Sequence, residues 1–119
     1  MNMNEKNIFD ISKKTIIITG AAGLLGSEYA KGLSKQGANV VLVDLDIKRC
    51  KEISSELNKK YAVESLAIKL DITKISSIKN MVKIIMKKYN KIDVLINNAA
   101  YQGNDKLRTI PFEELPLKN

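Results

Sequence analysis

The fold is decided by the stretch Lys14-Thr15-Ile16-Ile17-Ile18-Thr19-Gly20-Ala21-Ala22-Gly23-Leu24-Leu25-Gly26. It contains a short apolar run, three glycines at a spacing of three, and the beginning of a helical pattern. Glycine is needed where a chain turns sharply from a strand into a helix, and a phosphate can approach a backbone that carries no side chain. The stretch therefore predicts a strand, a dinucleotide-binding turn and a helix in succession.

Each of the three glycines has its own predicted task in this turn. Gly20 is expected to permit the tight turn, Gly23 to let the backbone approach a pyrophosphate, and Gly26 to let the helix pack closely on the strand. The backbone N–H groups of Leu24 and Leu25 are then expected to point at the phosphate, aided by the helix dipole. A plain strand-to-helix turn without a ligand is the alternative interpretation.

The rest of the chain alternates apolar runs with helical patterns. Strands are predicted at residues 15–19, 39–44, 65–70 and 92–96, and helices at 24–36, 46–60 and 74–90. Strands that are apolar on both faces and alternate with helices imply a parallel sheet covered on both sides. We therefore expect an incomplete Rossmann-type, doubly wound α/β fold with three layers, whose first four strands have the order 3-2-1-4. Residues 1–119 are expected to form a single dinucleotide-binding domain.

The last predicted helix has the clearest pattern, with one apolar stripe at helical spacing. The stripe consists of Ile75, Ile78, Val82, Ile85 and Tyr89.

An acidic residue, Asp44, closes the second predicted strand, 24 residues after Gly20. A carboxylate at this place accepts hydrogen bonds from the ribose hydroxyls of adenosine, and it would repel a 2′-phosphate. The position therefore predicts NAD as the cofactor in preference to NADP. A helix cap is the alternative task for such an aspartate, but Asp46 is the better candidate for the cap.

Two further motifs follow the third and fourth predicted strands. Asp71-Ile72-Thr73 comes after the third strand, where the aspartate can face a ligand crevice or cap the next helix, and the residues alone leave both roles open. Asn97-Asn98-Ala99-Ala100 ends the fourth strand. Its two amides can tie neighbouring strand ends together, and its small residues leave room for a flat ligand.

The composition excludes several kinds of chemistry. The chain has a formal net charge of +7, but its basic residues are 18 lysines spread over predicted helices and only two arginines, so nucleic acid is not an expected partner. With no histidine and one cysteine, an internal disulfide, the usual zinc ligand sets and histidine catalysis are ruled out. No apolar run reaches the roughly 18 residues that cross a membrane, and the N-terminus does not resemble a secretory signal, so we expect a cytoplasmic protein with no membrane partner.

Taken together, these motifs resemble the short-chain dehydrogenase/reductase family from about Ile8 to the end of the chain. Residues 19–26 are similar to its glycine motif, Asp71-Ile72 to its adenine-contacting pair, and Asn97-Asn98-Ala99-Ala100 to its Asn-Asn-Ala-Gly motif. The resemblance implies that Asp71 and Ile72 meet the adenine ring. It also implies that Asn98, Ala99 and Ala100 line the nearby ribose, while Asn97 braces the central strands.

The resemblance further implies an NAD-dependent oxidoreductase that moves a hydride between nicotinamide and an alcohol or carbonyl substrate, with sugar derivatives among the candidates. The complete enzyme is expected to be a homo-oligomer. The chain departs from the family at Leu24 and Ala100, where glycine is usual, and it lacks the catalytic Ser and the Tyr-x-x-x-Lys motif. We therefore expect no catalytic residue and no metal site here, and no activity from these 119 residues alone. A nucleotide-sugar epimerase or dehydratase and a non-catalytic nucleotide-binding module are the alternatives.

Overall fold

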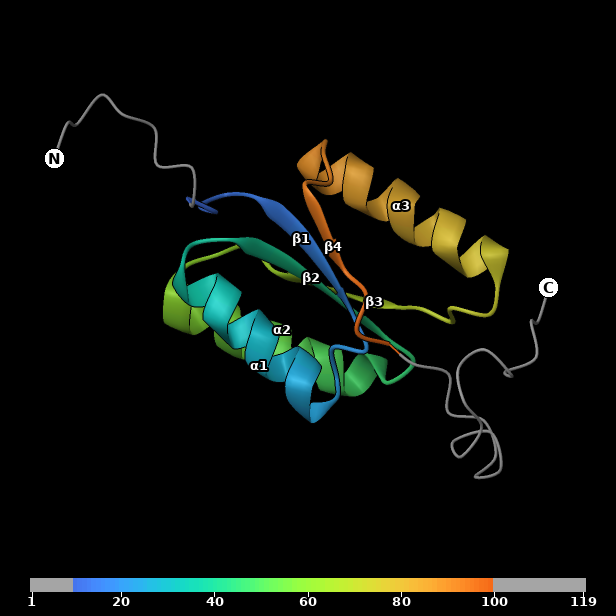
Figure 1. The fold of residues 1–119 in the computed structure, drawn as a ribbon, viewed down its shortest axis with the longest axis horizontal. Helices are drawn as coiled ribbons and strands as arrows, with labels where there is room; N and C mark the ends of the chain where they lie inside the picture. The colour runs from blue at the N-terminus through green and yellow to red at the C-terminus, as the bar shows by residue number, and fades with distance from the viewer. Residues whose placement is uncertain (1–9, 100–119) are drawn as a thin grey trace, which may run out of the picture.

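The computed structural model describes residues 10–99, which form a three-layer α/β/α unit (Figure 1). Its elements are β1 (Thr15–Thr19), α1 (Leu24–Lys35), β2 (Asn39–Asp44), α2 (Ile47–Tyr61), β3 (Leu66–Lys69), α3 (Ile75–Tyr89) and β4 (Val94–Ile96). The strands make one parallel sheet in the order β3-β2-β1-β4, so the predicted fold class and strand order are confirmed.

Two apolar clusters hold the layers together, one on each face of the sheet. Helices α1 and α2 cover one face and α3 covers the other (Figure 1). Ile16, Ile18, Val40 and Leu42 point toward α1 and α2, whereas the alternate residues of β1 and β2 pack with Met81 and Ile85 of α3. Because successive side chains of a strand point to opposite faces, a strand apolar at every position is buried on both sides.

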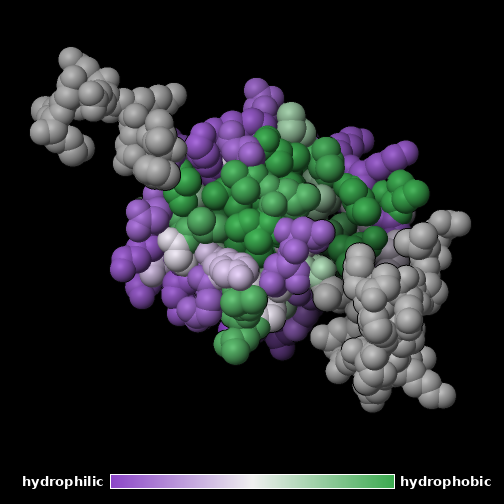
Figure 2. All heavy atoms as spheres, viewed as in Figure 1, coloured by the Kyte–Doolittle hydropathy of each residue, from purple (hydrophilic) through white to green (hydrophobic). Residues whose placement is uncertain are grey.

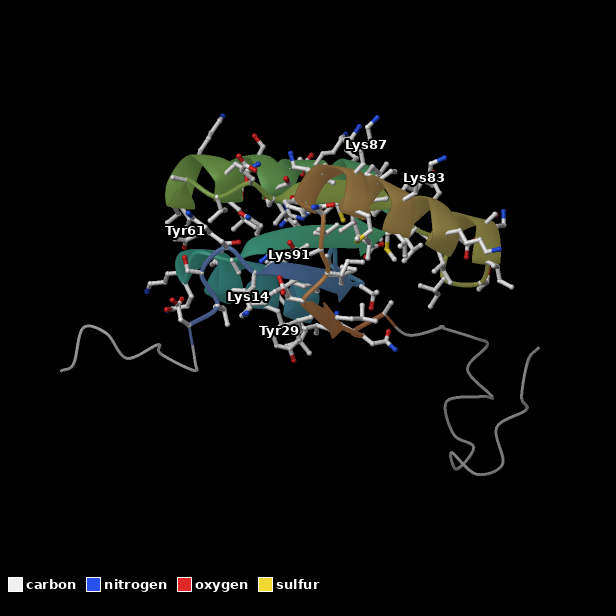
Figure 3. The ribbon with its side chains drawn as sticks, turned by 90° about the horizontal axis from the view of Figure 1, so that it is seen from above. Lys14, Tyr29, Tyr61, Lys83, Lys87 and Lys91 are labelled. Atoms are coloured by element: carbon white, nitrogen blue, oxygen red, sulfur yellow. The ribbon has the colours of Figure 1, made fainter. Side chains whose placement is uncertain are left out.

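The apolar stripe predicted on α3 is only partly buried. Ile85 is buried and Tyr89 is half-buried, but Ile75, Ile78 and Val82 are exposed, and Met81 completes the contact with the sheet instead. The lysines of this helix occupy its outer side, and Figure 3 shows Lys83 and Lys87 pointing away from the strands. Helix α3 therefore carries an exposed apolar side between its buried side and its lysines.

Strand β4 is shorter than predicted and forms one edge of the sheet. Its ladder with β1 pairs Val94 with Ile16 and Ile96 with Ile18. Leu95 is 58% exposed. Figure 2 shows hydrophobic side chains gathered in a broad band on the face that carries β4 and the adjoining side of α3. Within residues 10–99, no helix has the length and apolar character needed to cross a membrane.

Candidate functional site

A cleft of about 770 Å³ lies at the carboxyl ends of the four strands. In the sheet, β2 and then β3 lie on one side of β1, and β4 lies on the other side. The direction in which strands are added therefore reverses next to β1. Ligands of open parallel sheets bind at such a reversal. The cleft is lined by Thr19, Gly20, Gly23, Leu24, Leu25, Val43, Asp44, Leu45, Leu70, Asp71, Ile72, Thr73, Asn98 and Ala99.

Two of the predicted glycines are required by the packing of the protein itself. Gly20 has a φ of +65°, the left-handed region that favours glycine, and a Cβ there would lie 3.0 Å from Cα of Ala99. A Cβ on Gly26 would collide with the carbonyl oxygen of Gly20 and lie 2.9 Å from Cα of Ala21. Gly26 lies outside the cleft lining, and its contacts agree with a role in packing α1 on the turn.

Gly23 differs from both, because no contact with residues 10–99 demands a glycine there. Its φ is −75°, and an added Cβ would meet only the Gly20 carbonyl oxygen, at an ordinary 3.4 Å. Gly23 is the N-cap of α1 and provides no side-chain cap. No described residue accepts a hydrogen bond from the backbone N–H groups of Leu24 or Leu25, which begin the helix. A helix start with free N–H groups beside an open cleft fits a phosphate group.

Asp44 and Asp46 divide the two tasks considered for the end of β2. Asp46 caps α2, since its Oδ1 accepts the backbone N–H of Arg49 at 3.0 Å. Asp44 lines the cleft, where its Oδ2 accepts the N–H of Ala22 at 3.1 Å and its Oδ1 accepts the N–H of Asp46 at 3.0 Å. Each carboxylate oxygen keeps further acceptor capacity for ligand hydroxyls.

Thr19 joins the glycine turn to the Asn-Asn-Ala segment, a role that was not predicted from the sequence. Its Oγ1 accepts the N–H groups of Asn98 at 2.9 Å and of Ala99 at 2.8 Å. Its hydroxyl lies 3.2 Å from Oδ1 of Asn97, to which it can donate. The only signal in the sequence was a hydroxyl at the carboxyl end of a buried strand. Asn98 also donates from Nδ2 to the carbonyl oxygen of Gly20 at 3.3 Å.

Asp71 and Ile72 form the wall of the cleft beyond β3. Oδ1 of Asp71 accepts both the hydroxyl of Thr73 at 2.6 Å and its backbone N–H at 3.0 Å. These two bonds hold the pKa of Asp71 below its ordinary value, and the bond from the hydroxyl has the larger effect. The carboxylate is therefore ionised at neutral pH. Ile72 is exposed at the cleft. Asp71 thus makes a local turn and faces the cleft as well, while Lys74 is the N-cap of α3. Ala100 lies outside the described residues.

No described tyrosine or cysteine is placed for acid–base or nucleophilic chemistry in the cleft. Tyr29 on α1 and Tyr61 at the end of α2 are outside its lining (Figure 3). The hydroxyl of Tyr89 donates to the backbone carbonyl of Glu64, and burial raises its pKa. Burial also raises the pKa of Cys50 to about 12. Among residues 10–99 no group of three acidic, histidine or cysteine side chains could hold a metal ion.

Comparison with known proteins gives the family. The family model for short chain dehydrogenases matches residues 14–118, and the chain belongs to this family. It is 35% identical over 104 residues to an uncharacterized oxidoreductase, YxjF, of Bacillus subtilis, covering 87% of this chain and 38% of that protein. The family favours a dehydrogenase or reductase over the epimerase and binding-module alternatives.

Solved structures of oxidoreductases share this fold. L-Sorbose reductase from Gluconobacter frateurii, complexed with NADPH and L-sorbose, matches with a TM-score of 0.75 and 29% identity over 87% of this chain and 39% of that one. An NAD⁺-bound xylitol dehydrogenase matches with a TM-score of 0.73 and 28% identity over 78% of this chain and 35% of that one. The chain thus spans about two fifths of the length of the relatives described here.

Proposed function

We propose that this chain binds NAD and forms the cofactor-binding part of an oxidoreductase that acts on an alcohol or carbonyl substrate. The observation that carries the proposal is the pairing of Asp44 with the free helix start at Leu24 and Leu25. The Asp44 carboxylate can accept hydrogen bonds from ribose hydroxyls, and the N–H groups at the helix start can bind a pyrophosphate. The proposed cofactor contacts are Gly20, Gly23, Leu24, Leu25, Asp44, Asp71, Ile72, Asn98, Ala99 and Ala100. Gly26 belongs to the proposed cofactor-binding turn through its packing.

The charges around the cleft favour NAD over NADP. Its charged lining residues within the described part of the chain, Asp44 and Asp71, are both acidic, and no lysine or arginine of residues 10–99 lines it. Leu45, the residue after Asp44, is exposed and apolar. A 2′-phosphate would meet a carboxylate with no cation beside it, which is unfavourable in a partly desolvated cleft. The pyrophosphate, in contrast, is received by backbone N–H groups and the dipole of α1.

We further propose that the chain contributes no catalytic side chain of its own. A bound nicotinamide supplies the hydride chemistry, and the protein holds it in place. None of the four tyrosines has a lysine four residues later, so none of them matches the family's Tyr-x-x-x-Lys pattern. By analogy with the sorbose and xylitol enzymes, a polyol or ketose is the proposed substrate class. A homo-oligomeric complete enzyme is also proposed.

Calorimetric titration with NAD⁺ and with NADP⁺ tests the cofactor proposal. The protein, in the length that its gene encodes, is expected to bind NAD⁺ at least tenfold more tightly than NADP⁺. AMP and 2′-phospho-AMP make a matched pair of smaller probes, because they differ only in the group that Asp44 would meet. Equal or tighter binding of the 2′-phosphorylated member of either pair would overturn the preference, and no binding of either dinucleotide would overturn the function.

A further inference from the structure

We infer that Asp44 is also a positioning residue, which holds the glycine turn in the shape that binds pyrophosphate. The inference rests on the proposed function, because it concerns the same cleft. It adds to the ribose role a second task, at the pyrophosphate that adjoins this ribose. The acceptor is Oδ2 of Asp44, and the donor is the backbone N–H of Ala22, at 3.1 Å.

The turn is attached to β2 at two consecutive residues. The N–H of Ala21 donates to the carbonyl oxygen of Val43 at 3.2 Å, and the N–H of Ala22 donates to the side chain of Asp44. The N–H of Gly23 then closes the turn on the Gly20 carbonyl oxygen at 3.2 Å. Among the described residues, Asp44 supplies the only side-chain acceptor for these three N–H groups.

This arrangement decides which N–H groups remain free for the ligand. The N–H groups of residues 21–23 are bonded within the protein, whereas no acceptor in the described part of the chain receives those of Leu24 and Leu25. Without Asp44, the N–H of Ala22 loses its partner and the turn keeps only its backbone contacts. A loosened turn must be ordered again when pyrophosphate binds, and that ordering weakens affinity.

The positioning role and simple electrostatics predict opposite effects on pyrophosphate affinity when the carboxylate of Asp44 is removed. Removing a carboxylate close to an anion site reduces repulsion, so electrostatics alone predicts tighter pyrophosphate binding. Loss of the Ala22 bond predicts weaker binding. Asp44→Asn and Asp44→Ala separate the two effects, because both variants are neutral but only asparagine keeps a side-chain carbonyl that can accept an N–H.

The experiment measures dissociation constants for inorganic pyrophosphate in the purified full chain. From Asp44→Asn to Asp44→Ala, at equal charge, we expect about a fivefold loss of affinity, the size of one ordinary hydrogen bond. Asp46→Ala is the matched control, since it removes a nearby carboxylate that does not touch the turn. This control is expected to bind pyrophosphate as tightly as the unmodified chain or slightly more tightly. Equal affinities of the two Asp44 variants would overturn the inference.

Amide hydrogen exchange gives a second readout that general destabilisation would not mimic. In Asp44→Ala, the peptide that contains Ala22 is expected to exchange at least several times faster, while peptides from α3 are unchanged. Unchanged exchange at Ala22 would count against the inference. If the unmodified chain binds neither dinucleotide, the proposed function fails. If it binds NAD⁺ and the Asp44 variants show no difference in pyrophosphate affinity or exchange, only the positioning role fails.

Discussion

The side-chain oxygen of Thr19 lies 2.9 Å from the backbone nitrogen of Asn98 and accepts its N–H where β1 meets β4. The same oxygen accepts the N–H of Ala99, so one hydroxyl satisfies two consecutive backbone donors that follow the last described strand. A strand that ends beside a cleft leaves such donors without a ladder partner. Thr19 therefore fixes the backbone on one wall of the candidate site.

Thr19→Val is expected to destabilise the fold and to weaken nucleotide binding. Valine keeps the size and branching of threonine but leaves two partly buried N–H groups without an acceptor. Each such loss costs about 1–3 kcal/mol, so we expect the free energy of unfolding to fall by about 2–6 kcal/mol in urea titrations. Thr19→Ser retains the hydroxyl and is the control. A valine variant as stable as the serine variant would contradict this account.

Gly23→Val is expected to abolish nucleotide binding with little loss of stability. A Cβ at Gly23 meets only an ordinary contact, and a valine at the N-cap costs about 1 kcal/mol relative to glycine. The branched side chain would occupy the space that the pyrophosphate needs. Gly26→Ala is the matched contrast, since its Cβ collides with the turn and should cost about 1–3 kcal/mol. Unchanged NAD⁺ affinity in a folded Gly23→Val chain would refute the assignment of the turn.

Replacing Asp44 by alanine and Leu45 by arginine is expected to shift the cofactor preference toward NADP⁺. The change removes the carboxylate and supplies a cation for the 2′-phosphate. In the full-length gene product, the ratio of NADP⁺ to NAD⁺ affinity should rise at least tenfold. Because Asp44 also holds the glycine turn, the variant should bind NADP⁺ less tightly than the original protein binds NAD⁺. Titration of both cofactors, with Leu45→Arg alone as the control, measures the two effects.

Acid is expected to weaken the junction between β1 and β4 through Asp93. The backbone N–H of Thr15, at 2.8 Å, and then the Lys91 ammonium hold the pKa of Asp93 below its ordinary 3.8. A carboxyl whose pKa is lower in the folded state contributes stability above the unfolded value, and this contribution disappears as pH falls through the folded value. Asp93→Asn should therefore be less stable at neutral pH and show a flatter decline below about pH 4.

The control for the acid experiment is Glu56→Gln, which neutralises an exposed carboxylate on α2. Urea midpoints measured from pH 7 down to pH 2 give the comparison. The control should follow the unmodified chain throughout. An Asp93→Asn curve that runs parallel to the unmodified one would show that Asp93 does not contribute in this way.

The chain alone is expected to self-associate and to have no dehydrogenase activity. Its apolar face combines the β4 edge with the exposed side of α3, and unpaired strand edges with apolar side chains promote association. Leu95→Lys together with Val82→Lys should shift the chain toward monomer in sedimentation velocity. Ser76→Lys, a lysine added at an exposed position outside the apolar side of α3, should not. A monomeric, active 119-residue chain would overturn this prediction.

The fold was predictable because its signals are local. The apolar runs at residues 15–19 and 39–44 match β1 and β2 at both ends, since a doubly buried strand must be apolar throughout. The glycine turn and Asp44 could also be predicted from the sequence, because each stands at a fixed distance from a strand end. The bonds of Thr19 and the contact from Asp44 to Ala22 were not, because they depend on which strand ends lie together.

The sequence also could not predict how much of the apolar side of α3 is exposed. Ile75, Ile78 and Val82 share the helical spacing of Ile85, so the spacing alone cannot say which of them meets the sheet. The packing of Met81 and Ile85 against the sheet makes that choice. Periodicity identifies an apolar side of a helix, but packing decides how much of it is covered.

The junction of Thr19 with Asn98 and Ala99 has a consequence for biosynthesis. The bonded residues are separated by 79 and 80 positions, and a parallel neighbour of β1 can dock only after α3 has been made and has crossed the sheet. On the ribosome, a nascent chain that has exposed β1, β2 and β3 thus presents a glycine turn and Asp44 without the opposite wall. The proposed cofactor would meet only part of its binding site in this early intermediate. Cofactor binding would then act late, capturing chains whose fourth strand has already found its place.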